Sequence, residues 1–186
     1  MHVAVCLYDG FDELDAVGPY EVFARGAEAS MRTLDGEMVR AKHGLRVEPD
    51  GRLEAIDPDW LLVPGGGWND RSSAGAWAEY ERGRIPEAIR RAADHGTNLA
   101  GVCTGTMLLQ KAGVLDGRAA TTHHGAVDDL RATGVDCRNQ RVVDDGSIVT
   151  CGGVTAGIDL AFHVLRRECG ESVAASVAEA IEYDRS

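Results

Sequence analysis

A cysteine lies between two glycines at the point where a strand pattern gives way to a helical one. The segment Gly101-Val102-Cys103-Thr104-Gly105 has the spacing of a nucleophile elbow, in which small residues two positions before and after the nucleophile allow a tight strand-to-helix turn. Such a turn holds the nucleophile on strained backbone with its side chain exposed. The amides that open the following helix are expected to lower the thiol pKa from about 8.5, which favours the reactive thiolate. The spacing therefore predicts a catalytic nucleophile at Cys103, with a buried junction cysteine as the alternative.

A glycine run supplies candidate hydrogen-bond donors. Gly65, Gly66 and Gly67 follow Pro64 and form an extended loop with unobstructed amides. Together with the Thr104 amide, such a loop could form an oxyanion hole, although turns also use glycine runs. The sequence contains no GxGxxG segment, so a dinucleotide cofactor is not expected.

Three titratable side chains could assist the cysteine. Asp15 lies where a helix is predicted to begin, so it is either a cap or solvated residue, or an acid whose pKa is raised by burial beside a thiolate. His123 and His124 follow a short strand pattern. One of them could act as a general base or hold a substrate, and a surface histidine pair is the alternative.

The other cysteines give no sign of a disulfide framework or a metal site. The chain has five cysteines, an odd number, and no CxxC pair. Cys6 lies in an apolar strand pattern and is expected to be a small core residue. Cys137 and Cys151 flank a predicted hairpin and could pair only as a minority form in a reducing cytoplasm.

Strand and helix patterns alternate along the chain. The predicted strands cover residues 2–8, 31–34, 39–42, 60–63, 98–102 and 119–122, with a hairpin formed by 141–143 and 147–151. A first helix follows residue 12 and is expected to kink or restart at Gly18-Pro19, and later helices are predicted over 79–95, 104–112, 125–133, 154–165 and 172–181. The alternation predicts an α/β sandwich on a mainly parallel sheet, in one domain spanning 1–186.

The predicted elements bring the candidate residues together. In open α/β sheets, sites form beyond the carboxyl ends of the strands. Three predicted strands end in unusual residues, namely the segment 12–19, the segment 64–67 and Cys103. If these strands are neighbours in the sheet, all three ends converge on one site.

Composition and charge indicate the cellular location of the protein and the classes of partner that it can bind. No apolar run reaches the roughly 18 residues of a membrane span, and the N-terminus lacks a signal-peptide pattern, so we expect a cytoplasmic protein. A formal net charge of −11 argues against a nucleic-acid partner. Only Lys42 and Lys111 are lysines, and an acidic, lysine-poor surface suits a high-salt cytoplasm, although it could equally serve solubility alone. Unfolding midpoints in low and molar KCl test this halophile hypothesis.

The chain resembles the DJ-1/ThiJ/PfpI superfamily over nearly its full length. The resemblance rests on VAVCLYDGFDELDAVGPYEVF, LLVPGGG, AGVCTGTMLLQKAGVLDGRAATTHH and RVVDDGSIVTCGGVTAGIDLAFHVL. It implies a flavodoxin-like three-layer α/β sandwich with a mainly parallel sheet, and usually a homodimer.

Within the superfamily, the chain looks most like the isonitrile hydratase group. That group has an aspartate where the DJ-1 branch has glutamate, matched here by Asp15, and Cys-Thr at the elbow, matched by Cys103-Thr104. Further matches are the ATTH strand at 120–123 and the GGxTAGID segment at 152–159. The resemblance implies that Cys103 is the nucleophile, that Asp15 and Thr104 assist it, and that the amides of Gly66 and Thr104 form the oxyanion hole.

Some residues depart from the patterns of the related groups, and these departures bear on which substrate the protein uses. The protease-like branch has histidine directly after its cysteine, where this chain has Thr104, and related transcription regulators add a DNA-binding domain, which is not expected in a sequence that stops at Ser186. His124-Gly125 replaces bulkier residues of the hydratase group, and residues 27–59 have no diagnostic match.

The resemblance implies hydration of an isonitrile to an N-substituted formamide, on a small-molecule substrate and without cofactor or metal. Two alternatives remain. One is a DJ-1-like glyoxalase or stress protein that uses the same cysteine. The other is a ligand-sensing module without chemistry, against which the intact elbow argues.

Overall fold

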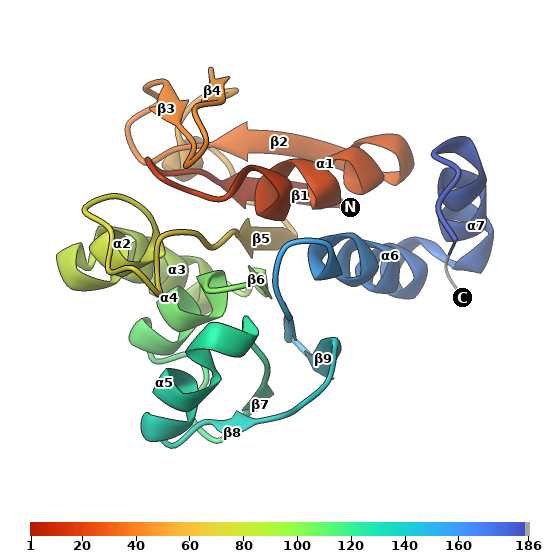
Figure 1. Ribbon diagram of the computed structural model, residues 1–186. Coiled ribbons are helices and arrows are strands. Elements are labelled where there is room, and N and C mark those ends of the chain that lie inside the picture. Colours follow the sequence, from red (N-terminus) through yellow and green to blue (C-terminus); the bar gives the residue numbers. More distant parts are fainter. Residues whose placement is uncertain (185–186) are drawn as a thin grey trace.

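A six-stranded sheet forms the central layer of the computed structural model, which describes residues 1–184. The strand order is β2-β1-β5-β6-β10-β9, and all neighbours are parallel except the edge pair β10–β9 (Figure 1). Counted along the chain, the five parallel strands follow the flavodoxin-like order 2-1-3-4-5, which confirms the predicted fold class. The strands are β1 (His2–Cys6), β2 (Glu28–Arg32), β5 (Trp60–Val63), β6 (Asn98–Val102), β9 (Val142–Asp145) and β10 (Ile148–Cys151).

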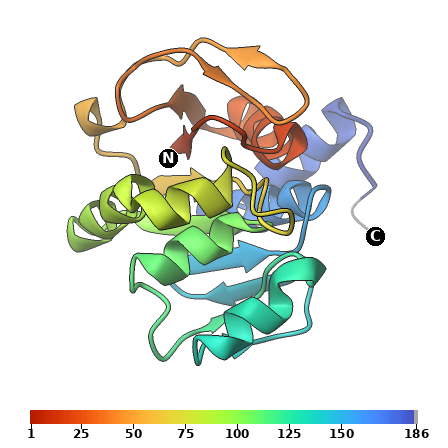
Figure 2. The ribbon, with the colours of Figure 1, turned by 60° about the vertical axis from the view of Figure 1, so that its left-hand side comes forward.

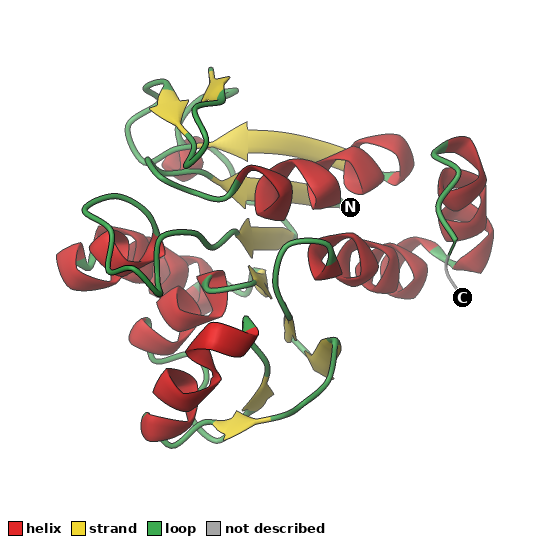
Figure 3. Ribbon diagram, in the orientation of Figure 1, coloured by secondary structure: helices red, strands yellow, loops and turns green. Residues whose placement is uncertain are grey.

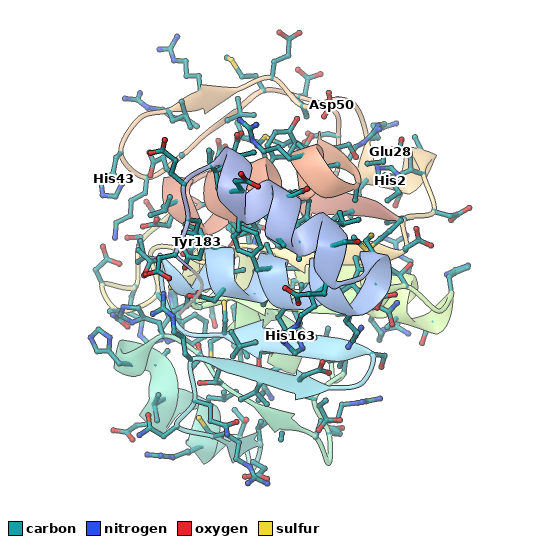
Figure 4. All side chains as sticks on the ribbon, turned by 90° about the vertical axis from the view of Figure 1, so that its right-hand side faces the viewer. His2, Glu28, His43, Asp50, His163 and Tyr183 are labelled. Atoms are coloured by element: carbon teal, nitrogen blue, oxygen red, sulfur yellow. The ribbon has the colours of Figure 1, made fainter. Side chains whose placement is uncertain are left out.

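Helices cover both faces of the sheet (Figure 3). One group consists of α1 (Glu13–Gly26), α6 (Ala156–Cys169) and α7 (Glu171–Ala180), which pack against one another. The other consists of α2 (Ala76–Arg82), α3 (Arg84–Asp94) and α4 (Gly105–Lys111). A hydrogen bond of 2.5 Å between His163 of α6 and Asp144 of β9 links the first group to the edge hairpin, and Figure 4 shows His163 between α6 and this hairpin.

Smaller elements complete the fold. A hairpin consists of β3 (Val39–Arg40) and β4 (Arg46–Val47). A second small sheet, β7 (Ala119–Ala120) with β8 (Asp136–Cys137), flanks α5 (Val127–Ala132). Two 3₁₀ turns cover Leu53–Ala55 and His124–Ala126. No helix within residues 1–184 combines the length and the apolar character needed to cross a membrane.

The apolar runs became central strands because both faces of a parallel sheet are covered. All four residues of β5 are buried, and so are the last four of β1 and of β6. A strand that is exposed on one face would alternate apolar with polar residues instead.

Two helix predictions were wrong in detail. The single helix predicted over 79–95 is two helices, α2 and α3, because Gly83 between them takes a left-handed conformation with φ of 78°. The restart expected as one outcome at Gly18-Pro19 does not occur, because α1 runs through both residues. Pro19 packs closely against Gly157 of α6, so tertiary packing holds the helix together despite the hydrogen bond that proline removes.

Candidate active site

The elbow predicted from the glycine spacing is present. Cys103, between β6 and α4, has a φ of 58°, a left-handed conformation that residues other than glycine rarely adopt. Its amide donates to the carbonyl of Gly152 at 3.1 Å, and its carbonyl accepts from the Thr122 hydroxyl at 2.8 Å. A Cβ on Gly105 would collide with the carbonyl of Val63 in β5. The turn therefore needs glycine at this position.

Asp15 lies in the first turn of α1 with its side chain fully buried. It does not cap the helix, because the N-cap is Asp12. Its two carboxyl oxygens accept hydrogen bonds from the backbone amides of Gly65 and Val154, both at 3.0 Å, and the carboxyl group lies beside the Cys103 thiol, close enough for the two groups to shift each other's pKa. The structure thus brings together two residues that the sequence analysis placed at converging strand ends.

The two groups form a coupled acid pair. Burial, and then the charge of Asp12, raises the pKa of Asp15 from 3.8 to about 7, against the opposing hydrogen bonds. Burial and then the charge of Asp15 raise the pKa of Cys103 far above its usual range. The pair therefore loses its first proton near neutral pH and keeps the second to much higher pH.

The lowered thiol pKa expected from the helix N-terminus is not found. The amides of Thr104 and Val154 do favour the charged sulfur. However, only 6% of Cys103 is exposed, and a carboxyl group lies beside it, so desolvation and like charge outweigh the amides.

The glycine loop contacts Thr104, the residue that follows the candidate nucleophile. The Gly66 amide donates to the Thr104 hydroxyl at 3.0 Å, and a Cβ on Gly65 would lie 2.5 Å from the Thr104 amide nitrogen. The oxyanion role of Gly66 and Thr104 stays a prediction. The resting structure adds a condition, because the Thr104 hydroxyl would have to release the Gly66 amide first.

The thiol opens into a cleft of about 270 Å³ at the carboxyl ends of the strands. Figure 2 shows the loop that follows β5, in yellow, between α1 and α5 beside this region. The sequence analysis identified five of the lining residues and missed the others. Trp68–Asp70 directly follow the glycine run, so adjacency could have suggested them, whereas Lys42 and Val154 gave no local signal. The lining consists of Asp12, Lys42, Gly66, Gly67, Trp68, Asn69, Asp70, Cys103, Thr104, His123 and Val154.

Of the two histidines, His123 lines this cleft and His124 does not. The Nδ1 atom of His123 accepts the Gly125 amide at 3.1 Å, so the neutral ring carries its proton on Nε2. Burial and the neighbouring His124 lower the His123 pKa. A neutral His123 can therefore donate to or accept from a substrate without adding charge to the site.

A latch holds the outer wall of the cleft. We use this name for Trp68, Arg71 and Asp129, in which one carboxylate oxygen of Asp129 accepts from the Trp68 ring nitrogen at 2.7 Å and from Arg71 at 3.1 Å. Arg71 has a φ of 50° and stacks its guanidinium 3.8 Å above the Trp77 ring. The latch ties the loop after the glycine run to α5.

One cluster beside the cleft has the composition of a metal site. Ligand atoms of Asp12, Glu13 and His43 lie within 4.8 Å of one another. Both Glu13 oxygens already accept hydrogen bonds of 2.7 Å from His43, one from its amide and one from its ring. Direct hydrogen bonds thus account for this arrangement, and nothing in the described residues points to a cation.

The DJ-1/PfpI family model matches residues 1–167. The chain belongs to the DJ-1/PfpI family. Among solved structures, a ThiJ/PfpI family protein from Pseudomonas syringae superposes with a TM-score of 0.89 at 27% identity, over 100% of this chain and 76% of that one. Oxidized DJ-1 of Toxoplasma gondii superposes with a TM-score of 0.84 over 98% of both chains, and at 23% identity it supports the fold alone.

Curated members of the DJ-1/PfpI family that resemble this chain differ in function. An isonitrile hydratase of Pseudomonas putida is 32% identical over 98% of this chain and 78% of its own length. A deglycase of Pyrococcus abyssi is 30% identical over 81% of this chain and 89% of its own. The transcriptional regulator CdhR of Pseudomonas aeruginosa, of the HTH type, is 32% identical over 78% of this chain but only 42% of its own. Family membership alone therefore does not select the reaction.

Proposed function

We propose that this protein is a cysteine-dependent enzyme that hydrates an isonitrile to an N-substituted formamide. The observation that carries the proposal is that the buried Asp15 carboxyl group lies beside the Cys103 thiol, which lines the cleft. An isonitrile carbon accepts a nucleophile and then needs a proton, and this pair offers both. The similarity to the isonitrile hydratase of Pseudomonas putida, which extends over nearly the whole chain, supports the choice of substrate class.

In the first half-reaction, the proton that the singly protonated pair retains moves from the Cys103 thiol to the Asp15 carboxylate, which gives a thiolate beside a neutral acid. The Cys103 sulfur forms a bond to the isonitrile carbon, and the Asp15 proton moves to the same carbon. The product is a neutral thioimidate on Cys103 beside an Asp15 carboxylate. The amides of Thr104 and Val154, which face the sulfur, steady it before attack.

In the second half-reaction, the Asp15 carboxylate takes a proton from a water molecule whose oxygen adds to the thioimidate carbon. That proton passes to the substrate nitrogen, and the Thr104 hydroxyl helps to orient the water. Collapse of the adduct breaks the carbon–sulfur bond and returns the hydroxyl proton to Asp15. The formamide leaves with one water added, and the thiolate and neutral acid are restored.

Two other functions have support among the relatives. Deglycase relatives favour a DJ-1-like use of Cys103 on a reactive carbonyl compound such as methylglyoxal. Regulator relatives favour a ligand-sensing role in which the cleft binds without turnover. Both would use the same cleft, so the decision rests on the product formed.

Turnover assays separate these functions. The purified protein is incubated with p-nitrophenyl isocyanide and, separately, with methylglyoxal, and products are identified by NMR. We expect the formamide, and we expect Cys103→Ser to abolish it while the matched variant Cys169→Ser, at the end of α6, retains it. Conversion of methylglyoxal alone would replace the proposal with a glyoxalase function, and binding without product would replace it with sensing.

A further inference from the structure

We propose that a second cleft, next to the candidate active site, binds a small organic or inorganic oxyanion. We call it the arginine cleft, because the side chains of Arg131, Arg138 and Arg141 line it together with His124. Its volume is about 380 Å³, within the range of small-molecule sites. No carboxylate belongs to its lining.

The charge of this cleft runs against that of the chain. The whole sequence has a formal net charge of −11, yet three arginines from α5 and from the segment before β9 line one hollow, and their partners Asp128, Asp136 and Asp159 lie outside its lining. Solubility or high-salt adaptation would explain a uniformly acidic surface, but neither explains why three arginines line one hollow. A locally positive, concave surface raises the local concentration of anions.

Two of the three arginines keep donors free for a ligand, whereas Arg141 already donates to Asp159 at 2.5 Å and to the Thr155 hydroxyl at 3.1 Å. Among residues 1–184, the guanidinium group of Arg131 pairs only with Asp128, at 3.6 Å, and the Asp128 side chain is 99% exposed. Arg138 uses Nε and one terminal nitrogen on a single oxygen of Asp136. A guanidinium group has five N–H donors, and exposed pairs of this kind are weak, so both side chains can turn their remaining donors to an anion.

The shape and chemistry of the cleft select a small ligand. Guanidinium forks match the paired oxygens of carboxylate and phosphate groups. Short side chains of Val127 and Ala156 complete the wall and leave room for a compact carbon skeleton. The acidic surface outside the cleft would repel a polyanion such as DNA, so we assign the cleft to a small carboxylate- or phosphate-bearing molecule.

The arginine cleft adjoins the backbone of the nucleophile. Thr122 and Gly152 line it, and the same two residues hold the carbonyl and the amide of Cys103 in the strained elbow. An anion bound there would contact Thr122 and Gly152, the residues that fix the backbone conformation of Cys103. We therefore expect occupancy to change the rate at which iodoacetamide alkylates Cys103, whichever reaction the cysteine performs.

Calorimetric titration with citrate and with inorganic phosphate, at ionic strength matched with KCl, tests the site. We expect saturable binding of one anion per chain. Arg138→Gln and Arg131→Gln should each weaken it about tenfold, the effect of losing one charge-assisted hydrogen bond. The matched control Arg25→Gln, an exposed and ion-paired arginine on α1, should bind like the wild type.

The arms of the experiment also identify the source of the anion. Tighter binding of citrate points to a carboxylate ligand, and tighter binding of phosphate points to a phosphoryl group. The proposal is overturned if neither anion saturates, if KCl alone reproduces the heat, if Arg25→Gln weakens binding as much as the cleft variants do, or if a DNA duplex binds and both small anions fail. Circular dichroism of each variant checks that a loss of binding heat does not come from a loss of folded structure.

Discussion

The carboxyl group of Asp15 lies beside the thiol of Cys103, although the two residues come from α1 and from the turn after β6. The backbone amides of Gly65 and Val154 occupy both carboxyl oxygens, so the position of the acid is fixed from two sides. Val154 itself has a φ of 54°. Cys103, which belongs to the pair, and Val154, whose amide binds Asp15, thus both have strained backbone conformations. Strain of this kind persists only where the surrounding structure maintains it.

Replacing the acid should stop turnover. Asp15→Asn keeps the size of the side chain but removes its proton, so we expect the rate on p-nitrophenyl isocyanide to fall roughly 10²–10⁴-fold, the usual effect of a general acid or base. Asp94→Asn, an exposed change on α3, is the control and should leave the rate unchanged. Single-turnover kinetics measure the effect, and an Asn variant with wild-type rate would return Asp15 to a structural role.

The rate should depend on pH through the first ionisation of the pair. Below pH 7 both groups are protonated, and no thiolate is available, because the Asp15 pKa is raised to about 7. We expect kcat/KM to fall about tenfold per pH unit below that value and to reach a plateau above it. The rate at which sub-stoichiometric iodoacetamide alkylates Cys103, measured by peptide mapping, should fall in the same way below pH 7. A rate that is flat from pH 5 to 8, or preferential labelling of another cysteine, would contradict this.

The same pKa shift predicts how stability depends on pH. Folded Asp15 holds its proton up to about pH 7, whereas the unfolded chain loses it near pH 3.8, so the free energy of unfolding falls as pH rises through that window. Three pKa units correspond to about 4 kcal/mol. Asp15→Asn removes this dependence, so the melting temperature of the variant minus that of the wild type should rise from pH 4 to pH 8, by on the order of 10 °C. If the melting temperatures of the two proteins instead changed equally with pH, Asp15 would be ionised in the folded state throughout this pH range.

Removing the latch should loosen the cleft wall. Asp129→Ala leaves the ring nitrogen of Trp68, a residue that is only 3% exposed, without its acceptor and releases Arg71. We expect kcat/KM to fall roughly tenfold to a hundredfold, mainly through KM, because a misplaced wall positions the substrate less well. Asp128→Ala, on the same helix but almost fully exposed, is the matched control. A lower melting temperature with unchanged kinetics would limit the latch to a structural role.

We expect the protein to be a homodimer. Leu14 and Val17 on α1 are 36% and 37% exposed, and Val154, whose amide contacts the same helix, is 38% exposed, which leaves adjacent apolar groups in water. Light scattering at micromolar concentration in high salt should give twice the chain mass. Val17→Glu should give a monomer, whereas Arg90→Glu on α3 should not. A wild-type monomer would refute the prediction.

The local pattern of the sequence determined the elements and the elbow. Continuous apolar runs predicted the buried strands, since a sheet covered on both faces requires them. The glycines around Cys103 predicted a turn that no larger residue fits, and the structure shows the positive φ and the crowding that this implies. Where neighbours decide the outcome, the pattern failed, as at Pro19, where packing against Gly157 keeps α1 continuous.

The chemistry of the site was decided by tertiary structure. Local sequence suggested a helix N-terminus that lowers the thiol pKa, but burial and a carboxyl group from a distant helix raise it instead. The partners of Asp15, the latch on Trp68 and the arginine cleft likewise join segments far apart in the chain. A pKa depends on desolvation and on charges a few ångströms away, and those distances exist only once the chain has folded. The sequence by itself therefore determined which residue is the nucleophile candidate, and only the folded structure decided the environment in which that residue ionises.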